Sequence, residues 1–205
     1  MKQAILRYAI LFLLLALPLS VLGCSREQEP SREGVRYDEA RIEEYVRLET
    51  YEGLTVSLPD ANATKGEAIW QELLAKAQVL SYPEEALSYY EEQRRETYRY
   101  YAKKNDWSYE ETLSFFGVTE EEIQNEAKNM VKGDLVFRYI VKQAKISLTE
   151  EDKAAQLDRY VQKYAKDYGY SEEYIRQNML ELIYDSMLYD KTMEYLIVHN
   201  TFITP

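Results

Sequence analysis

The chain has 205 residues, of which 46% are hydrophobic and 30% charged, and this balance excludes both a disordered chain and one embedded in a membrane. Its formal net charge is −11, which disfavours nucleic acid as a partner, because contacts from Lys and Arg to phosphates supply most of that affinity. Glycine occurs only 7 times and proline 5 times, so helix-breaking residues are scarce and helices are favoured.

The first 23 residues have the layout of a secretory signal. Lys2 and Arg7 give a basic start, and an apolar run follows at 9–17. This run is shorter than the ~20 residues that a membrane-spanning helix needs. We therefore predict a signal peptide at 1–23 that is not part of the fold. Its removal takes away only Lys2 and Arg7 among charged residues, so the rest of the chain carries −13.

The predicted signal ends in Val21-Leu22-Gly23-Cys24, which resembles the lipobox of bacterial lipoproteins. In that family the cysteine is acylated with a diacylglyceryl group and becomes the mature N-terminus after cleavage. Val21 stands where a lipobox usually has Leu, and Leu22 is bulkier than the usual residue. Cys24 is the only cysteine, so no disulfide can form within the chain. An ordinary signal followed by an incidental cysteine is the alternative.

Lipidation of Cys24 would determine the location of the protein in the cell. The resemblance implies a lipid-anchored protein on the extracytoplasmic face of a bacterial cell membrane. Anionic lipid headgroups repel a chain as acidic as this one, so attachment to the membrane needs another cause. Each buried CH₂ of an acyl chain contributes ~0.8 kcal/mol, and two chains suffice for stable anchoring.

The stretch between the predicted signal and the first predicted helix has little regular pattern. Residues 24–35 are charged and lack an apolar period, so we predict a flexible tether. Residues 36–63 are predicted to form an extended and short helical segment. Within them Leu54, Val56 and Leu58 alternate with polar residues, which indicates one short strand.

Residues 64–205 are predicted to form a helical domain, because a helix-start pattern recurs along them. In this capping box, a Ser or Thr side chain and an acid three residues later each accept a backbone N–H. The pattern, or a close variant, occurs at Thr64 with Glu67, Ser81 with Glu84, Ser108 with Glu111, Thr119 with Glu122 and Thr149 with Asp152, and Ser171 opens the last helix. The predicted helices cover 65–80, 83–104, 109–116, 120–145, 150–168 and 172–198. The predicted fold class is all-α, with at most one short N-terminal strand.

The predicted helices differ in their apolar faces. The helix at 120–145 carries two adjacent apolar rows, which begin at Ala127 and Val136, so we predict that it lies in the middle of a helical body. The helix at 83–104 has an apolar row that Arg94 interrupts. The last helix, 172–198, is apolar almost all round, which fits either a central helix or one that lines a groove.

Several segments along the chain match a known family in order and with compatible spacing. They are LSYPE at 80–84, AKKNDWSYEETL at 102–113, FGVTEEEI at 116–123, AKNMVK at 127–132, IVKQAKISLTEE at 140–151, YGYSEE at 168–173 and KTMEYLI at 191–197. Together they resemble the C-terminal chaperone domain of trigger factor, whose helical architecture is also seen in the periplasmic chaperone SurA. The resemblance covers 70–198. It implies a helical body with projecting arms that holds unfolded or nascent chains against apolar surfaces without ATP.

The chain departs from full trigger factor in two ways. Only Ser57 to Lys65 separates the predicted strand from the first helix, too little for the FKBP-type prolyl isomerase domain of that family. Nothing resembles its ribosome-binding domain, and trigger factor is cytosolic whereas this chain carries an export signal. We therefore expect neither ribosome docking nor isomerase activity, and a foldase label would rest on homology alone.

The candidate peptide-binding residues are aromatic or methionine side chains at helical spacing. They are Tyr90, Tyr101, Phe115, Tyr139, Tyr164 and Met187. The chain has 20 tyrosines, and tyrosine joins an apolar face to a polar tip, as at surfaces that contact other chains. The same spacing also fits a buried core, so both interpretations stay open.

No catalytic or metal-binding constellation is evident. His199 is the only histidine, which excludes a site with several histidines. Glycine-rich phosphate motifs are absent, and the acidic clusters at 120–122 and 150–152 stand at helix starts, where capping explains them. We expect no cofactor, no metal and no enzymatic activity.

These patterns favour a lipid-anchored, ATP-independent, holdase-like chaperone with a role in protein folding and transport. Its expected partners are unfolded or exported polypeptides and, through Cys24, the membrane, but neither nucleic acid nor the ribosome. One alternative is a structural or adaptor lipoprotein that docks a specific folded partner. Another is a prolyl isomerase.

Overall fold

The structure, a computed structural model, describes residues 35, 37–60 and 62–204. The predicted signal at 1–23, Cys24 and the predicted tether up to residue 34 lie outside the described residues. The described part contains eight α-helices, one short 3₁₀ helix and four short strands, so the all-α class is confirmed. The expectation of at most one strand is wrong. Along the same residues, none of the helices combines the length and apolar composition that crossing a lipid bilayer requires.

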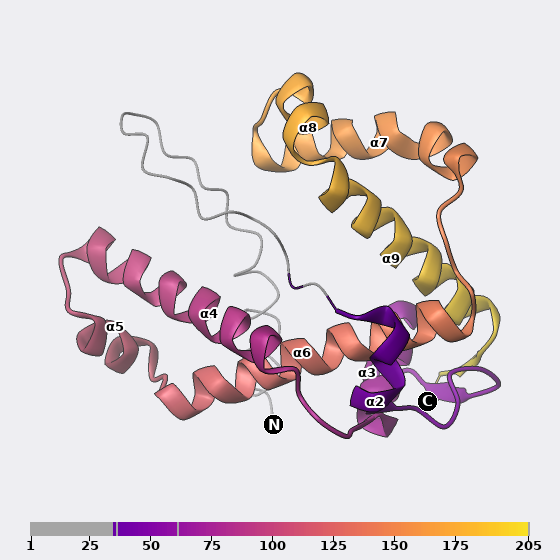
Figure 1. Cartoon of the computed structure of the whole chain (residues 1–205), viewed down its shortest axis with the longest axis horizontal. Helices are drawn as coiled ribbons and strands as arrows, with labels where there is room; N and C mark the ends of the chain where they lie inside the picture. Colours follow the sequence, from indigo (N-terminus) through magenta and orange to yellow (C-terminus); the bar gives the residue numbers. More distant parts are fainter. Residues whose placement is uncertain (1–34, 36, 61, 205) are drawn as a thin grey trace. The chain divides into compact units, whose positions relative to one another are not determined.

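Figure 1 shows the elements in chain order. The helices are η2 (Glu39–Arg41), α2 (Ile42–Tyr45), α3 (Lys65–Lys76), α4 (Glu84–Asn105), α5 (Tyr109–Phe116), α6 (Glu120–Gln143), α7 (Glu150–Tyr168), α8 (Glu172–Asn178) and α9 (Leu180–Val198). The strands are β1 (Val46–Arg47), β2 (Thr55–Ser57), β3 (Gln78–Val79) and β4 (Thr201–Ile203). β1 pairs with β3 in antiparallel fashion, and β2, the predicted strand, pairs with β4 in parallel.

Most of the predicted helix starts are correct. Complete capping boxes form at Thr64, Ser108, Thr119 and Thr149, and the Ser171 hydroxyl caps α8. Ser81 does not cap α4. Instead Pro83, with an extended ψ of 124°, precedes the first helical residue and offers no side-chain hydrogen bond. The Ser81 hydroxyl donates to the Glu44 carbonyl at 3.4 Å.

Two predicted helices are shorter than expected. α3 ends at Lys76 because Ala77 is extended, with ψ 130°, and leads into β3. The predicted helix at 172–198 is divided at Met179, whose φ of −128° and ψ of 13° separate α8 from α9.

Gly117 offers a direct test of one helix end. It terminates α5 with a left-handed φ of 64°, and no heavy atom lies within 4 Å of a Cβ added there. We expect Gly117→Ala to lower the free energy of unfolding by about 1 kcal/mol, because an L-residue is strained in this conformation. Urea unfolding measures the change. Gly66→Ala in α3 is the control, since its Cβ would meet only Met193 at an ordinary 3.5 Å, and an equal loss there would contradict the expectation.

The described chain divides into two compact units. The smaller unit takes Leu148–Leu188, and its core is built from α7, α8 and the first part of α9. The larger unit takes the described residues up to Ser147 and those from Tyr189 onward. The predicted domain at 64–205 is thus shared between the two units. The described residues of the segment at 36–63 join the larger unit, whose core includes Ile42 and Val56.

Within the larger unit, α6 occupies the central place that its two apolar rows predict. Its fully buried residues are Ile123, Ala127, Val131, Leu135, Val136 and Ile140. The helix contacts α2, α3, α4 and β1, so its wide stripe meets neighbours on more than one side. Burial of this stripe makes α6 the element on which the rest of the unit is assembled.

Candidate functional site

α4 and α5 form an arm of the larger unit, defined as residues 84–116 (Figure 1). α4 packs along α6, and α5 folds back on α4. The reversal takes three residues, because Asp106 adopts a left-handed φ of 57° and Ser108 caps α5.

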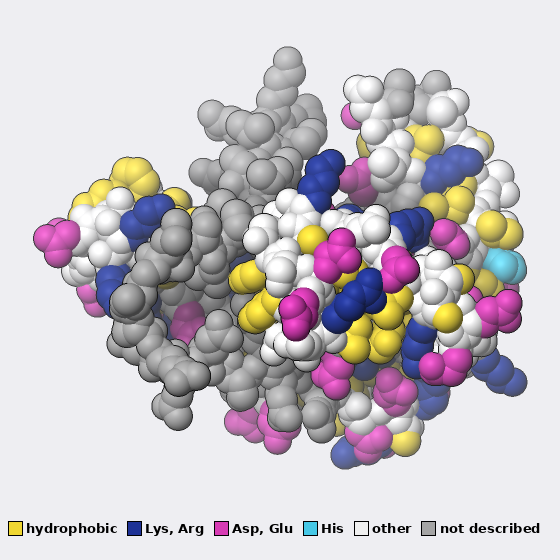
Figure 2. All heavy atoms as spheres, turned by 90° about the horizontal axis from the view of Figure 1, so that it is seen from above, with side chains coloured by type: hydrophobic (Ala, Val, Ile, Leu, Met, Phe, Trp, Pro, Cys, Tyr) yellow, Lys and Arg dark blue, Asp and Glu magenta, His cyan; other side chains and the backbone are white. Residues whose placement is uncertain are grey.

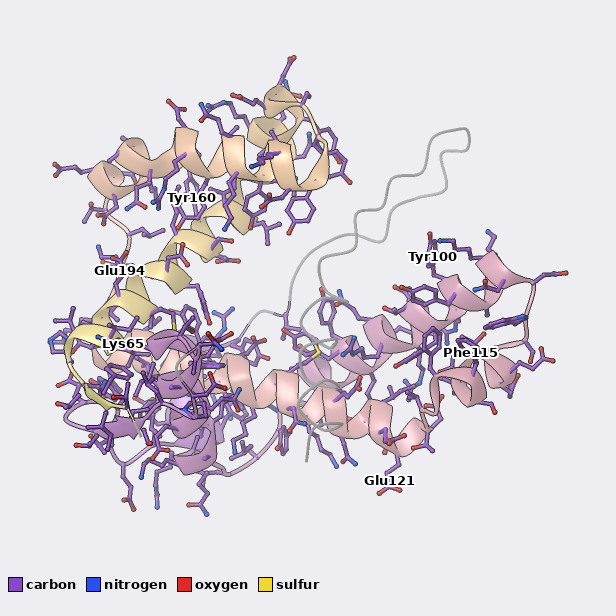
Figure 3. The ribbon with its side chains drawn as sticks, turned by 180° about the vertical axis from the view of Figure 1, so that it is seen from behind. Lys65, Tyr100, Phe115, Glu121, Tyr160 and Glu194 are labelled. Carbon is purple, nitrogen blue, oxygen red and sulfur yellow. The ribbon has the colours of Figure 1, made fainter. Side chains whose placement is uncertain are left out.

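The arm carries a connected group of aromatic rings, which we call the ring cluster. Its members are Tyr98, Tyr100, Tyr101, Trp107, Phe115 and Phe116, with neighbouring ring centroids between 4.8 and 5.9 Å apart. Such tilted and edge-to-face arrangements are the favourable ones for aromatic pairs. In Figure 3, Tyr100 on α4 and Phe115 on α5 lie together on the arm. The cluster therefore joins both helices and the turn between them.

Much of the ring cluster is open to water. Phe115 is 68% exposed, Tyr100 44%, Phe116 42% and Trp107 37%. Figure 2 shows hydrophobic side chains gathered at the end of the arm, at left, with charged side chains beside them. Since a ring side chain has ~200 Å² of surface, the exposed part amounts to roughly 400 Å². Patches of this size on a monomer often mark an interaction site.

Charged side chains tie the arm to the start of α6. Arg95 on α4 pairs with Glu120 on α6 at 3.0 Å and with Glu91 at 3.0 Å. The Tyr109 hydroxyl of α5 donates to the same Glu120 carboxylate at 2.8 Å. Partial burial and this hydrogen bond raise the pKa of Tyr109 to about 12. One carboxylate thus links α4, α5 and the start of α6 beside the ring cluster.

A buried ion pair joins α4 to the middle of α6. Nε of Arg94 lies 2.9 Å from Oε2 of Glu126, and the two side chains are only 10% and 19% exposed. Burial raises the pKa of Glu126, and the charge of Arg94 opposes that shift. The arginine that interrupts the apolar row of α4 is therefore matched by an acid on the facing helix.

A second buried carboxylate lies further along α6. Oδ2 of Asp134 accepts the Tyr90 hydroxyl of α4 at 2.5 Å and the Tyr37 hydroxyl at 3.0 Å. Burial raises the pKa of Asp134, although both hydroxyls and the nearby Arg138 favour its charged form. Burial and the same carboxylate raise the pKa of both tyrosines.

The raised pKa of Asp134 has a predictable effect on stability. Below the ordinary carboxyl pKa of 3.8, Asp134 is protonated in both the folded and the unfolded chain. As pH rises from there through the raised pKa, the folded state retains its proton longer, so the contribution of Asp134 to stability declines. Asparagine does not titrate. We expect the stability of the wild type relative to Asp134→Asn to fall across this interval and then level off. Urea unfolding at a series of pH values measures it, and a difference independent of pH contradicts the shift.

The structure does not bring the six predicted binding residues together. Tyr101 and Phe115 both lie in the ring cluster. Tyr90 and Tyr139 are half-buried, and their hydroxyls bond Asp134 and the Leu48 carbonyl. Tyr164 and Met187, 8% and 2% exposed, are core residues of the smaller unit, where the Tyr164 hydroxyl pairs with Ser186. A single surface made of all six is therefore not present in the described structure.

Four members of the ring cluster were missed by reasoning from the sequence. They are Tyr98, Tyr100, Trp107 and Phe116. The available signal is density, since seven aromatic residues occur between positions 98 and 116. Helical periodicity conceals this density, because it assigns neighbouring aromatic residues to different faces of the helix.

The described residues offer no other evident reactive group. Among them, no group of three or more His, Cys, Asp or Glu side chains is placed to hold a metal ion. The His199 ring stacks on Tyr195 at 4.0 Å, and its Nδ1 lies 2.8 Å from the Tyr195 carbonyl at the end of α9.

Comparison with protein families tests the family relationship that the order of the sequence motifs suggested. The model of a family described as bacterial trigger factor protein (TF) C-terminus matches residues 59–198, more than half of the chain. The chain belongs to this family. The match covers the whole arm, α6 and the smaller unit, so the ring cluster lies on a trigger factor C-terminal domain of chaperone type. Neither the curated proteins nor the solved structures gave a match.

Proposed function

We propose that this member of the trigger factor C-terminal family is a holdase-like chaperone that works without ATP and captures unfolded, exported polypeptides on the ring cluster. The exposed rings at the end of a braced arm are the observation that supports this proposal. Aromatic faces and edges accept many apolar side chains, so binding is weak and tolerant of sequence. The ion pairs at Glu120 and Glu126 keep the rings presented when no client is bound.

The proposal places this activity at the extracytoplasmic face of a bacterial membrane, through lipidation of Cys24. In the sequence Cys24 and Tyr37 are thirteen residues apart. At ~3.4 Å per residue, this stretch spans at most about 45 Å. Tyr37 bonds to Asp134 beside the arm. A lipid on Cys24 therefore keeps the ring cluster close to the membrane, where exported chains emerge. Metabolic labelling with a fatty acid tests this step, with label expected on the wild type and absent from Cys24→Ser.

Suppression of aggregation tests the chaperone activity itself. Residues 24–205 carrying Cys24→Ser are mixed with a reduced, unfolding client, and light scattering follows its aggregation. Suppression at a few-fold molar excess is the expected result. No effect at that excess contradicts the proposal. Capture of one stoichiometric folded partner, with no effect on unfolded clients, would support an adaptor lipoprotein instead. We expect no rate increase in an assay of proline-peptide isomerisation.

A further inference from the structure

The segment at 37–48, which we call the strap, lies outside the residues that match the family. It nevertheless packs against α6, and Figure 1 shows this indigo segment lying across that helix. Lys142 of α6 bonds the Ala40 carbonyl at 3.1 Å and forms an ion pair with Glu43. Ile42, Val46 and Leu48 of the strap are buried in the core of the larger unit, and Tyr37 and Tyr45 pack against it. The strap is therefore an integral part of that unit.

At its N-terminal end the strap reaches the base of the arm. The Tyr37 hydroxyl donates to Oδ2 of Asp134, the same oxygen that accepts the hydroxyl of Tyr90 on α4. The Arg138 guanidinium lies 4.8 Å from the centre of the Tyr37 ring and pairs with Glu39 of the strap at 3.4 Å. One carboxylate oxygen on α6 thus connects the strap to the arm.

We propose that Tyr37 is a positioning residue, and that through Asp134 the strap controls the mobility of the arm. Two hydroxyls on one oxygen fix the orientation of the carboxylate. When Tyr37 is absent, the carboxylate turns more freely, and the bond that holds Tyr90 to α6 opens more often. Because the strap continues in sequence toward Cys24, the N-terminal attachment and the presentation of the ring cluster are connected. That last link rests on the proposed lipidation and client binding, whereas the control of arm mobility does not.

Hydrogen exchange on the full chain in detergent micelles tests this control. In Tyr37→Phe we expect amides at 87–93 of α4 to exchange about fivefold faster, since a lost hydrogen bond of ~1 kcal/mol changes a local opening equilibrium by that factor. Amides at 150–168 of α7 stay unchanged. Tyr139→Phe is the matched control, because its hydroxyl bonds α6 to the Leu48 carbonyl of the strap but not to Asp134. Unchanged exchange at 87–93 overturns the proposal, as does an equal rise in Tyr139→Phe or along α7.

Variants that already carry Tyr90→Phe distinguish coupling through the shared Asp134 carboxylate from a simple packing effect of Tyr37. Once the Tyr90 hydroxyl is gone, adding Tyr37→Phe is expected to change exchange at 87–93 no further. Independent, multiplying effects of the two substitutions contradict coupling through Asp134. Aggregation assays on the same variants report client binding separately. If the chain captures no client but shows this exchange pattern, the strap proposal stands and the chaperone proposal fails.

Discussion

Glu126→Ala is expected to destabilise the larger unit by about 3 kcal/mol, because it leaves the Arg94 guanidinium buried without its counter-charge. The Arg94 side chain is only 10% exposed, so water cannot replace the lost carboxylate without opening the contact between α4 and α6. Urea unfolding followed by circular dichroism measures the loss. We expect the arm to loosen first, since this pair lies between α4 and α6.

Two further variants distinguish burial from charge as the cause of the stability loss expected in Glu126→Ala. Arg99 pairs with Glu92 on the same helix, but both side chains are 51% exposed. Glu92→Ala is therefore expected to change the free energy of unfolding by less than about 1 kcal/mol. The double variant Arg94→Met with Glu126→Leu removes both charges and is expected to stay near the wild type. Equal losses in Glu92→Ala and Glu126→Ala would show that burial of the pair is not what matters.

Trp107→Ser combined with Phe115→Ser is expected to weaken client capture at least tenfold while leaving the fold intact. Each ring that becomes buried against a partner contributes on the order of 2 kcal/mol to binding. Phe115 is 68% exposed and Trp107 37% exposed, and neither belongs to the buried core of either unit, so the fold is retained although truncation of Trp107 removes some packing within the arm. Aggregation suppression across a titration of the chaperone gives the change in capture, and thermal unfolding checks that the variant is folded.

The matched control replaces an exposed apolar residue elsewhere on the larger unit. Val198 at the end of α9 is 77% exposed, and Val198→Ser is expected to leave client capture unchanged. Equal losses in both variants would indicate that general surface hydrophobicity, rather than the ring cluster, holds the client.

Local patterns predicted the helices well because the interactions that start and stop a helix lie within a few residues. Thr119 and Glu122 cap α6 through contacts three residues apart, and the apolar rows of α6 predict its burial. The strand pairs have no such local signal. β2 and β4 lie at opposite ends of the described chain and pair over only three residues each. These strand pairs form only when the whole larger unit has folded.

The candidate site was only partly predictable for a related reason. Helical spacing shows which residues share a face, but not whether a neighbour covers that face. Phe115 remains uncovered on the arm, whereas Met187 is covered by the core of the smaller unit. Arg94 reads in the sequence as a break in an apolar row. Its partner Glu126 is 32 positions away on another helix, and only the fold brings the two together.

Site-specific photo-crosslinking tests the proposed client surface most directly. A photoreactive phenylalanine analogue is placed at position 115 on the arm or, in a separate variant, at position 198. Each variant is irradiated with a labelled unfolded client. We predict strong adducts from position 115, which excess unlabelled unfolded client suppresses and the same client in its folded form does not, and few adducts from position 198. Equal adducts from both positions, or none from position 115 when the variant still suppresses aggregation, would contradict client binding at the ring cluster.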